Sequence, residues 1–503
     1  MAILNTENWT FTEADASCSP TRLRAARVRI LCAFAFSVLG ELAAYAGRHG
    51  LLRWLAASAV AVIFITQTVA DARCGARRAV FRDLPGTAAL AALYVMCSAS
   101  ALAPPPDMGA VSAHMAASGG HSAHSHAHLV CTAAVFLLIA RYFIKSALFA
   151  ASAPMAELDA ATGVSGTYSA GDIVAVPRGG VVPVDGRLVS GVTSVDGSAL
   201  TGDMERVTKR AGDTLYCGDV NYDRAVEIEA LRGRDDSVYP RLLAAARRGL
   251  SGECPGLRLR ARRVGFYIVP LVFLAAAVAV AAAVLSGGDV HAAAMRAASA
   301  AIAVSPSAFA ILCPSADAVG FAALARSGIL ARARAADALA AAKSVEIGAS
   351  ARVADDGSTR EGLAKTEETL RAMGFTLTPP AAVRVVSARE RARVDGRERA
   401  VRVAIGRAAE MDFCGEDVCL TRDRIAHLLK AVYICRLLRK RARLAFAALL
   451  AYTAAAALLA ALGALTPAYA GAAAAACALG IVISNGRLEK RCRVITFEKL
   501  TRA

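Results

Sequence analysis

A cysteine, a proline and a serine stand together inside an apolar segment of this 503-residue chain. Cys313 comes directly before Pro314, and Asp317 lies four residues after the cysteine, on the same face of a helix. A thiolate suits soft cations such as Cu(I), and also Zn²⁺. Proline has no N–H group, so it leaves the carbonyl one turn earlier without its helical partner. We therefore expect a transition-metal site at Cys313, Ser315 and Asp317; the alternative for Asp317 is a carboxylate that reaches the aqueous interface.

A second group of metal-binding side chains lies in a segment rich in Gly, Ser and Ala. Five of the 8 histidines in the chain fall there: His114, His121, His124, His126 and His128. Neutral imidazoles close together bind Zn²⁺, Cu²⁺ or Ni²⁺ with modest selectivity. This pattern predicts weak metal binding that falls below about pH 6, where imidazoles become protonated. The alternative is a low-complexity loop whose histidines are incidental.

The elements that must position these groups are long apolar helices. Hydrophobic residues make up 56% of the chain, charged residues only 20%, and the mean hydropathy is +0.45. This composition excludes a disordered scaffold and a small disulfide-stapled domain. Eight segments approach the roughly 20 apolar residues that cross a bilayer. They are 30–47, 51–70, 87–103, 127–148, 264–286, 297–318, 444–464 and 466–485.

The basic residues predict the orientation of these segments. They gather beside the apolar segments, as at 258–263 and 436–443, whereas 104–128 contains no Lys or Arg. Because cytoplasmic connections favour Lys and Arg, we expect a multi-pass protein of the plasma (cytoplasmic) membrane with both termini in the cytoplasm. Membrane lipid is then its surrounding partner. The net charge of +17 does not indicate nucleic-acid binding, because the basic clusters lack interleaved aromatic residues. Arg141 and Lys145, inside the fourth segment, are expected to extend to the interface.

Two segments are long enough to form domains outside the membrane. The first is β-rich, with Val-rich runs separated by Gly-Gly and Asp-Gly turn signals, and the second is mixed and strongly charged. The second segment also contains helix-like stretches at 361–373 and 423–440. The expected organisation is an N-terminal tail at 1–29, spans one to four at 30–148 with a His-rich outer loop at 104–128, a β-rich domain at 149–262, spans five and six at 263–318, a mixed domain at 319–440, spans seven and eight at 441–486 and a tail at 487–503.

The β-rich segment carries three motifs of a known family. GDIV at 171–174, VPVDG at 182–186 and SVDGSALTGD at 194–203 resemble the actuator domain of P-type ATPases, most closely in the heavy-metal-translocating, CPx-type, copper-like branch. The resemblance implies eight transmembrane helices, an actuator after the fourth and a Cys-Pro motif in the sixth, where this chain has Cys313 and Pro314. EDVCLTRD at 416–423 is similar to the end of the family's phosphorylation domain.

The catalytic motifs of that family are missing. Its DKTGT aspartate accepts the γ-phosphate as a nucleophile, but this sequence has no DKTGT. The family frame carried forward without gaps places Ala351 at the nucleophile, and a short shift places Asp355 there as a remnant; a solvated turn is the alternative. The chain also lacks the His-Pro and GDGxND motifs that serve ATP and Mg²⁺ in the family. The actuator's TGE is replaced by Thr201, Gly202 and Asp203.

The predicted fold is membrane α-helical, with eight transmembrane helices, a small β-rich actuator-like cytoplasmic domain and a reduced α/β phosphorylation-domain remnant. The resemblance implies a degenerate relative that binds or helps move a transition metal cation, Cu or Zn, beside a complete P-type ATPase or a metallochaperone. One alternative is a divergent but active ATP-driven exporter with Asp355 as nucleophile and Asp203 aiding dephosphorylation. Another is a non-enzymatic membrane scaffold or regulator of a complete pump.

Overall fold

The computed structural model divides the chain into two units. It describes residues 20–45, 51–73, 83–102, 126–160, 167–198, 206–241, 257–285, 290–304, 306–331, 333–348, 360–377, 381–387, 401–405, 417–420 and 427–494. The first unit, which we call the helical unit, comprises Met1–Phe149, Leu257–Ser315 and Arg443–Asn485. The second comprises Ala150–Gly256, Ala316–Ala442 and Gly486–Ala503.

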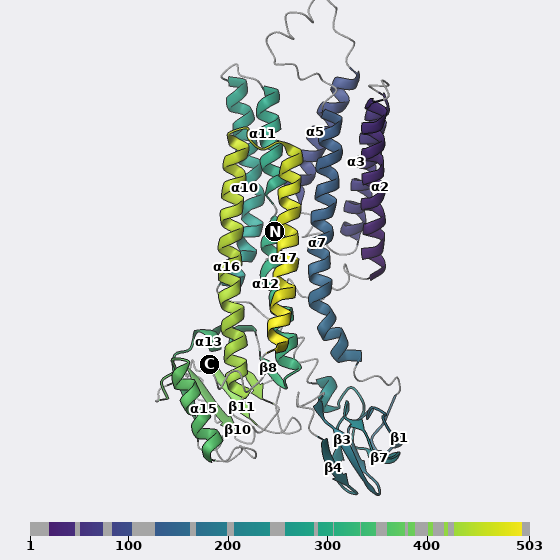
Figure 1. Ribbon diagram of the computed structural model, residues 1–503, viewed down its shortest axis with the longest axis vertical. Helices are drawn as coiled ribbons and strands as arrows, with labels where there is room; N and C mark the ends of the chain where they lie inside the picture. The colour runs from purple at the N-terminus through teal and green to yellow at the C-terminus, as the bar shows by residue number, and fades with distance from the viewer. Residues whose placement is uncertain are drawn as a thin grey trace, which may run out of the picture. The chain divides into compact units, whose positions relative to one another are not determined.

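Long helices build the helical unit, and several of them continue past its boundaries (Figure 1). They are α2 (Pro20–Tyr45), α3 (Leu51–Arg73), α5 (Leu84–Leu102), α7 (His126–Ala160), α10 (Leu257–Leu285), α11 (Val290–Ala303), α12 (Pro306–Ala325), α16 (His427–Ala461) and α17 (Pro467–Val494). Helix α2 packs on α3, and α11 packs on both α5 and α10. Each of the eight predicted apolar segments falls on one of these helices, the sixth on α11 and α12 together.

Four of the described helices are long and apolar enough to cross a membrane. They are the segments Trp54–Arg73, Ala127–Ala150, His427–Ala461 and Pro467–Cys492. A bent pair, His291–Phe309 with Ile311–Ala325, raises the number to five if the pair forms one span. The apolar helices Leu84–Met96 and Arg263–Val278 are shorter. The chain is thus a multi-pass membrane protein, and the prediction of eight spans remains a prediction.

Small residues allow the helices of this unit to approach closely. The core contains many alanines, including Ala33, Ala57, Ala134 and Ala301. A Cβ atom built on Gly40 of α2 would lie 2.9 Å from the Cβ of Ala56 on α3. Close approach of this kind is typical of helices that associate in lipid, where the packing of small residues replaces the hydrophobic effect. Large apolar side chains of α2 such as Leu31, Phe34 and Leu42 are exposed, as expected for a lipid-facing surface.

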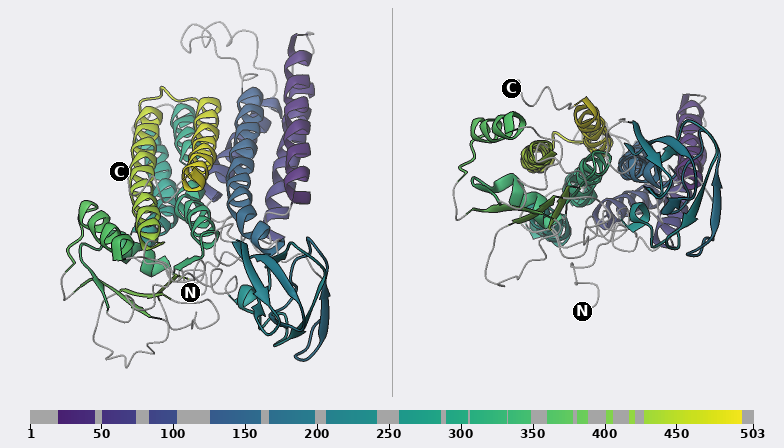
Figure 2. Two further views of the ribbon diagram at one scale, coloured as in Figure 1. Left: turned by 60° about the horizontal axis from the view of Figure 1, so that its bottom comes forward. Right: turned by 90° about the horizontal axis from the view of Figure 1, so that it is seen from below.

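Antiparallel strands form the segment predicted to be β-rich; they are drawn in teal in Figure 2. One sheet has the order β1-β7-β2-β5 and the other β4-β3-β6. The strands are β1 (Ile173–Val176), β2 (Gly186–Leu188), β3 (Val192–Asp196), β4 (Arg206–Arg210), β5 (Thr214–Leu215), β6 (Val220–Asn221) and β7 (Val226–Ala230). Strand β7 alternates buried and exposed residues, so one face packs into the core with Leu188 and Leu215. Gly186 is required there, because a Cβ would lie 2.9 Å from Ile228 Cδ1.

The mixed segment contains a mostly parallel sheet. The order is β8-β12-β11-β10-β9, with β9 to β12 parallel and β8 antiparallel to β12. The strands are β8 (Ile329–Ala331), β9 (Val345–Ile347), β10 (Val383–Ser387), β11 (Val401–Ile405) and β12 (Val418–Leu420), accompanied by α13 (Ala333–Ala341) and α15 (Arg360–Ala372). Helix α15 confirms the helix expected at 361–373. The described part of the segment is therefore α/β. The edge strand β9 is partly covered, because the Val345 N–H donates to the Thr376 carbonyl at 2.9 Å.

Candidate functional site

The actuator loop predicted to carry catalysis lies in a hairpin connection. Strands β3 and β4 pair antiparallel, and their register places Asp196 opposite Arg206. Thr201, Gly202 and Asp203 belong to the connection between them and lie outside the described residues. The structure therefore describes the strands that hold the loop, and the role of the three residues stays a prediction.

A buried carboxylate fixes the core beside this hairpin. Asp185 of the VPVDG motif is 1% exposed and accepts two backbone N–H groups, from Cys217 at 2.9 Å and from Val238 at 2.8 Å. Arg232 Nε lies 3.7 Å from its Oδ2 atom. Burial raises the pKa of Asp185, although both hydrogen bonds and the arginine oppose that shift. The aspartate therefore orders three chain segments, a structural role that its motif alone did not reveal.

A second buried carboxylate lies in the same core. Asp219 is 3% exposed and accepts the Tyr216 N–H at 2.9 Å. Burial raises its pKa to about 7, so this carboxyl changes protonation near neutral pH. Burial also raises the pKa of Cys217 to about 12 and that of Tyr239 to about 12, so both stay protonated and neither is an activated nucleophile.

The predicted metal residues of α12 are all buried, but they do not share one surface. Cys313 is 2% exposed, Ser315 0% and Asp317 7%. The Ser315 hydroxyl donates to the Ile311 carbonyl at 2.8 Å, so it is occupied by its own helix. Cys313 and Asp317 lie four residues apart and share a face, whereas positions two apart do not. Among the described residues, no group of three or more His, Cys, Asp or Glu side chains could hold a metal ion.

The helix backbone is interrupted and bent ahead of the cysteine. Helix α11 ends at Ala303 and α12 begins at Pro306, and the segments His291–Phe309 and Ile311–Ala325 meet at 44°. The Tyr452 hydroxyl donates to the Ala303 carbonyl at 2.9 Å. Helix α12 runs on through Pro314, so the opening of the helix expected from this proline stays a prediction.

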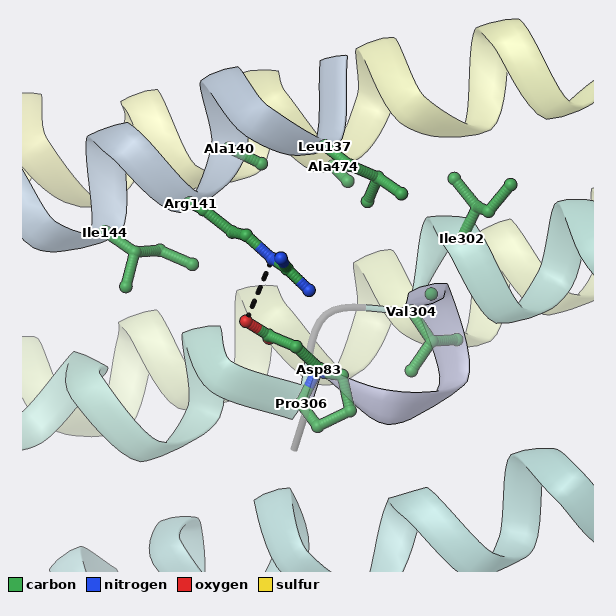
Figure 3. A pocket seen from close by; sticks show the side chains of 10 residues that line it. Asp83, Leu137, Ala140, Arg141, Ile144, Ile302, Val304, Pro306 and Ala474 are labelled. Carbon is green, nitrogen blue, oxygen red and sulfur yellow. Dashed lines mark ion pairs between the residues drawn. The ribbon is translucent and has the colours of Figure 1, made fainter. Parts of the chain in front are cut away.

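A small polar cavity, shown in Figure 3, lies next to this interruption inside the helical unit. Its volume is about 30 Å³, enough for one or two water molecules. Asp83 and Arg141 supply its charged groups, and Arg141 Nε lies 3.2 Å from Asp83 Oδ2. Apolar side chains line most of the rest: Leu137, Ala140, Ile144, Ile302, Val304, Pro306 and Ala474.

The sequence analysis predicts that Arg141 extends to the interface, but in the structure its side chain is buried among the helices. It is 8% exposed, donates to Thr68 Oγ1 at 2.8 Å and pairs with Asp83. Lys145 likewise pairs with Asp71 at 2.5 Å. Asp71 and Asp83 lie just outside the predicted spans 51–70 and 87–103, so local pattern did not predict these pairs. Both basic residues neutralise carboxylates within the helical unit, which lowers the cost of burying them.

The structure describes only part of the predicted histidine group at 114–128. His114, His121 and His124 lie outside the described residues, and His126 starts α7 with its side chain undescribed. His128 is described, and its Nδ1 atom lies 3.0 Å from Oε1 of Glu41 on α2. No local sequence pattern predicts this pairing, because the two residues lie 87 positions apart.

Asp355, which the sequence analysis considers as a remnant of the nucleophile, lies outside the described residues. Strand β9 ends at Ile347, and the Gly348 N–H that follows donates to the Val385 carbonyl at 3.0 Å. Reactive groups in parallel sheets sit at the carboxyl ends of strands. The first carboxylate after this strand end is Asp355, eight residues beyond Ile347.

Comparison with known proteins identifies the segment that is similar to an actuator domain. Residues 166–247 match the model of the P-type ATPase actuator domain. The chain is 34% identical over 104 residues to copper-transporting ATPase 2 of Homo sapiens, which is 21% of this chain and 7% of that protein. It is 36% identical over 74 residues to the zinc-transporting ATPase of Bacillus subtilis, which is 15% of this chain and 12% of that protein.

Among solved structures, a zinc-transporting PIB-type ATPase in the E2.Pi state matches at a TM-score of 0.41 and 15% identity, over 92% of this chain and 99% of that one. The residues that match the family model, 166–247, carry the GDIV, VPVDG and TGD motifs. Over this part of its length the chain is similar to P-type ATPases that transport copper and zinc, and it spans only a small part of the length of those relatives.

Proposed function

We propose that this chain is a membrane pseudoenzyme that binds and helps move a transition metal cation, copper or zinc, without an ATP cycle of its own. One observation carries the proposal: the chain has an ordered actuator core and a mostly parallel sheet whose strand β9 ends at Ile347, directly before Gly348. No carboxylate follows for seven residues, so the nucleophile needed for an acyl phosphate has no place at the strand end. The sequence also lacks the motifs that serve ATP and Mg²⁺ in the family.

The metal part of the proposal rests on two candidate regions. Cys313 and Asp317 offer a thiolate and a carboxylate on one face of α12, a pair that suits Zn²⁺ and soft copper. The histidines from His114 to His128 offer imidazoles in a second region. Copper and zinc transport by the relatives supports the choice of cargo.

The arrangement in the membrane completes the proposal. We propose eight spans with both termini on the cytoplasmic side of the plasma membrane, and the histidines on the opposite side. A complete P-type ATPase or a metallochaperone is the proposed protein partner, since a chain without an ATP cycle needs another source of direction. The domain boundaries 149–262 and 319–440 are proposed for the actuator and the phosphorylation-domain remnant.

Metal flux into proteoliposomes tests this function. The purified chain is reconstituted, and entry of Zn²⁺ or Cu(I) is measured with and without Mg²⁺ and ATP. We expect flux that ATP does not change and that Cys313→Ala abolishes, while Cys32→Ala, at an exposed cysteine of α2, has no effect. ATP-driven flux would instead support the active exporter, and neither flux nor binding would support the scaffold.

A further inference from the structure

Helices α2 and α7 meet through a carboxylate and an imidazole. Glu41 lies near the end of α2 and His128 near the start of α7. The His128 Nδ1 and Glu41 Oε1 atoms are 3.0 Å apart, and the two side chains are 48% and 50% exposed. The structure thus joins the histidine-rich segment to a helix with no histidine of its own.

Glu41 is the sole acidic residue in the sequence of α2, a helix whose surface is otherwise rich in exposed leucine, valine and phenylalanine. A carboxylate on such an apolar helix is costly unless it is used. A hydrogen bond to one imidazole meets part of that cost. A cation bound between the two groups would meet it more fully, because its positive charge balances that of the carboxylate.

The geometry suits two ligands of one ion. Metal–ligand bonds of about 2.1 Å at right angles or at the tetrahedral angle place the donor atoms roughly 3.0–3.4 Å apart. The 3.0 Å between Nδ1 and Oε1 lies at the lower end of that range. Glu41 lies four residues before the end of α2 and His128 two residues after the start of α7, and both side chains are half exposed. At these helix ends an ion could enter from water and keep water molecules as its other ligands.

We propose that Glu41 and His128 form a two-ligand site for a divalent cation of the Cu²⁺ or Zn²⁺ class, which joins α2 to α7. Imidazole nitrogen with carboxylate oxygen is a donor set that both ions accept. The proposal rests on the proposed function for its choice of cation. It extends that function by assigning the carboxylate ligand to Glu41, outside the histidine-rich segment.

The experiment isolates these two residues in the full-length chain. A background with His114, His121, His124 and His126 changed to Asn and Cys313 changed to Ala keeps His128 as the single histidine of the group and removes the thiol of the other proposed site. Cu²⁺ binding is followed by electron paramagnetic resonance, which counts nitrogen ligands, and Zn²⁺ binding by competition with a chromophoric chelator. Matched controls are Glu229→Gln, at an exposed carboxylate of β7, and His291→Asn, at an exposed histidine of α11.

We expect the background to bind one Cu²⁺ with one nitrogen ligand. Glu41→Gln and His128→Asn should each weaken binding by roughly tenfold or more, and the controls should leave it unchanged. Glu41→His should restore binding and add a second nitrogen to the spectrum. Thermal unfolding without metal verifies that each variant is folded.

Two outcomes separate this site from the proposed function. If the unaltered chain binds Zn²⁺ or Cu²⁺ but Glu41→Gln binds as tightly as its background, the Glu41 site is wrong and the proposed function stands. If the unaltered chain binds neither ion, both are wrong. A Glu41→His variant without a second nitrogen would also overturn the site, because the two side chains would then not face one ion.

Discussion

Arg141 and Asp83 form an ion pair inside the helical unit, with Arg141 Nε 3.2 Å from Asp83 Oδ2 and the two side chains 10% and 23% exposed. The other oxygen of Asp83 accepts a hydrogen bond from Ser307, the second residue of α12. The Arg141 guanidinium also lies 4.5 Å from the centre of the Phe64 ring on α3. One charge pair therefore connects α3, α7, the start of α5 and the start of α12, the helix that carries Cys313.

Removing one partner of this pair should destabilise the helical unit. Arg141→Met leaves the Asp83 carboxylate without its counter-charge, so we expect a loss of about 3 kcal/mol or more in unfolding free energy. Adding Asp83→Asn should recover part of that loss, because the uncompensated charge disappears. Thermal unfolding of the detergent-solubilised protein measures both. Arg187→Met, at an exposed arginine of β2, is the control; equal effects of the two arginine variants would contradict the buried pair.

Helices α12 and α16 pack through a glycine. A Cβ built on Gly320 would lie 2.5 Å from Leu438 Cδ1, so Gly320→Ala forces the leucine to move. We expect a loss of about 1–3 kcal/mol, recovered in part by Leu438→Ala. Gly480→Ala on α17 is the matched control: nothing lies within 4 Å there, and alanine should stabilise the helix slightly. Additive effects of the Gly320 and Leu438 changes would show that they are not in contact.

The stability of the actuator core should depend on the protonation of Asp219. The folded-state pKa, about 7, lies above the usual value of 3.8, so folding favours the protonated carboxyl. This contribution is present below about pH 4 and is lost as the pH rises through 7. Asp219→Asn should make the stability of the actuator core less dependent on pH. Amide hydrogen exchange of peptides from β3 and β6, corrected for the pH dependence of chemical exchange, measures it in the whole chain.

The pKa of Asp223 is shifted in the opposite direction to that of Asp219. Asp223 is exposed, and a hydrogen bond from Ser194 lowers its pKa. Its contribution is therefore present above its usual pKa and is lost in acid. Asp223→Asn should leave the pH dependence between 4 and 7 unchanged. If Asp219→Asn behaved in the same way, the burial of Asp219 would not control stability.

Because Cys313 and Asp317 share one face of α12, we predict that both side chains bind zinc. Cys313→Ala and Asp317→Asn should each weaken Zn²⁺ binding by roughly tenfold, because each removes a donor. Ser315→Ala should change it less than about twofold, since that hydroxyl bonds the Ile311 carbonyl. Competition with a chromophoric zinc chelator gives the affinities. Ser327→Ala is the control, because that hydroxyl also bonds its own helix; a large effect of Ser315→Ala would place its oxygen on the metal.

The β-rich fold was predictable from local pattern, whereas the charge pairs were not. Val-rich runs and the Asp-Gly turn of VPVDG predict the strands β1 to β3, and the buried residues of β3 recur with a period of two. Asp83 and Ser307 lie 224 positions apart, and local periodicity says nothing about such pairs. For the same reason the expected position of Arg141 at the interface was wrong, and the contact of Glu41 with His128 was not foreseen.

The central claim, a heavy-metal ATPase relative without an ATP cycle, is tested most directly by phosphoenzyme formation. Purified chain is incubated with radiolabelled ATP, with and without Cu(I) and Zn²⁺, and acid-stable label is counted beside an Asp355→Asn variant. We predict no label in protein that is folded and binds metal. A metal-dependent, hydroxylamine-sensitive label that Asp355→Asn abolishes would contradict the claim and make this chain an active pump.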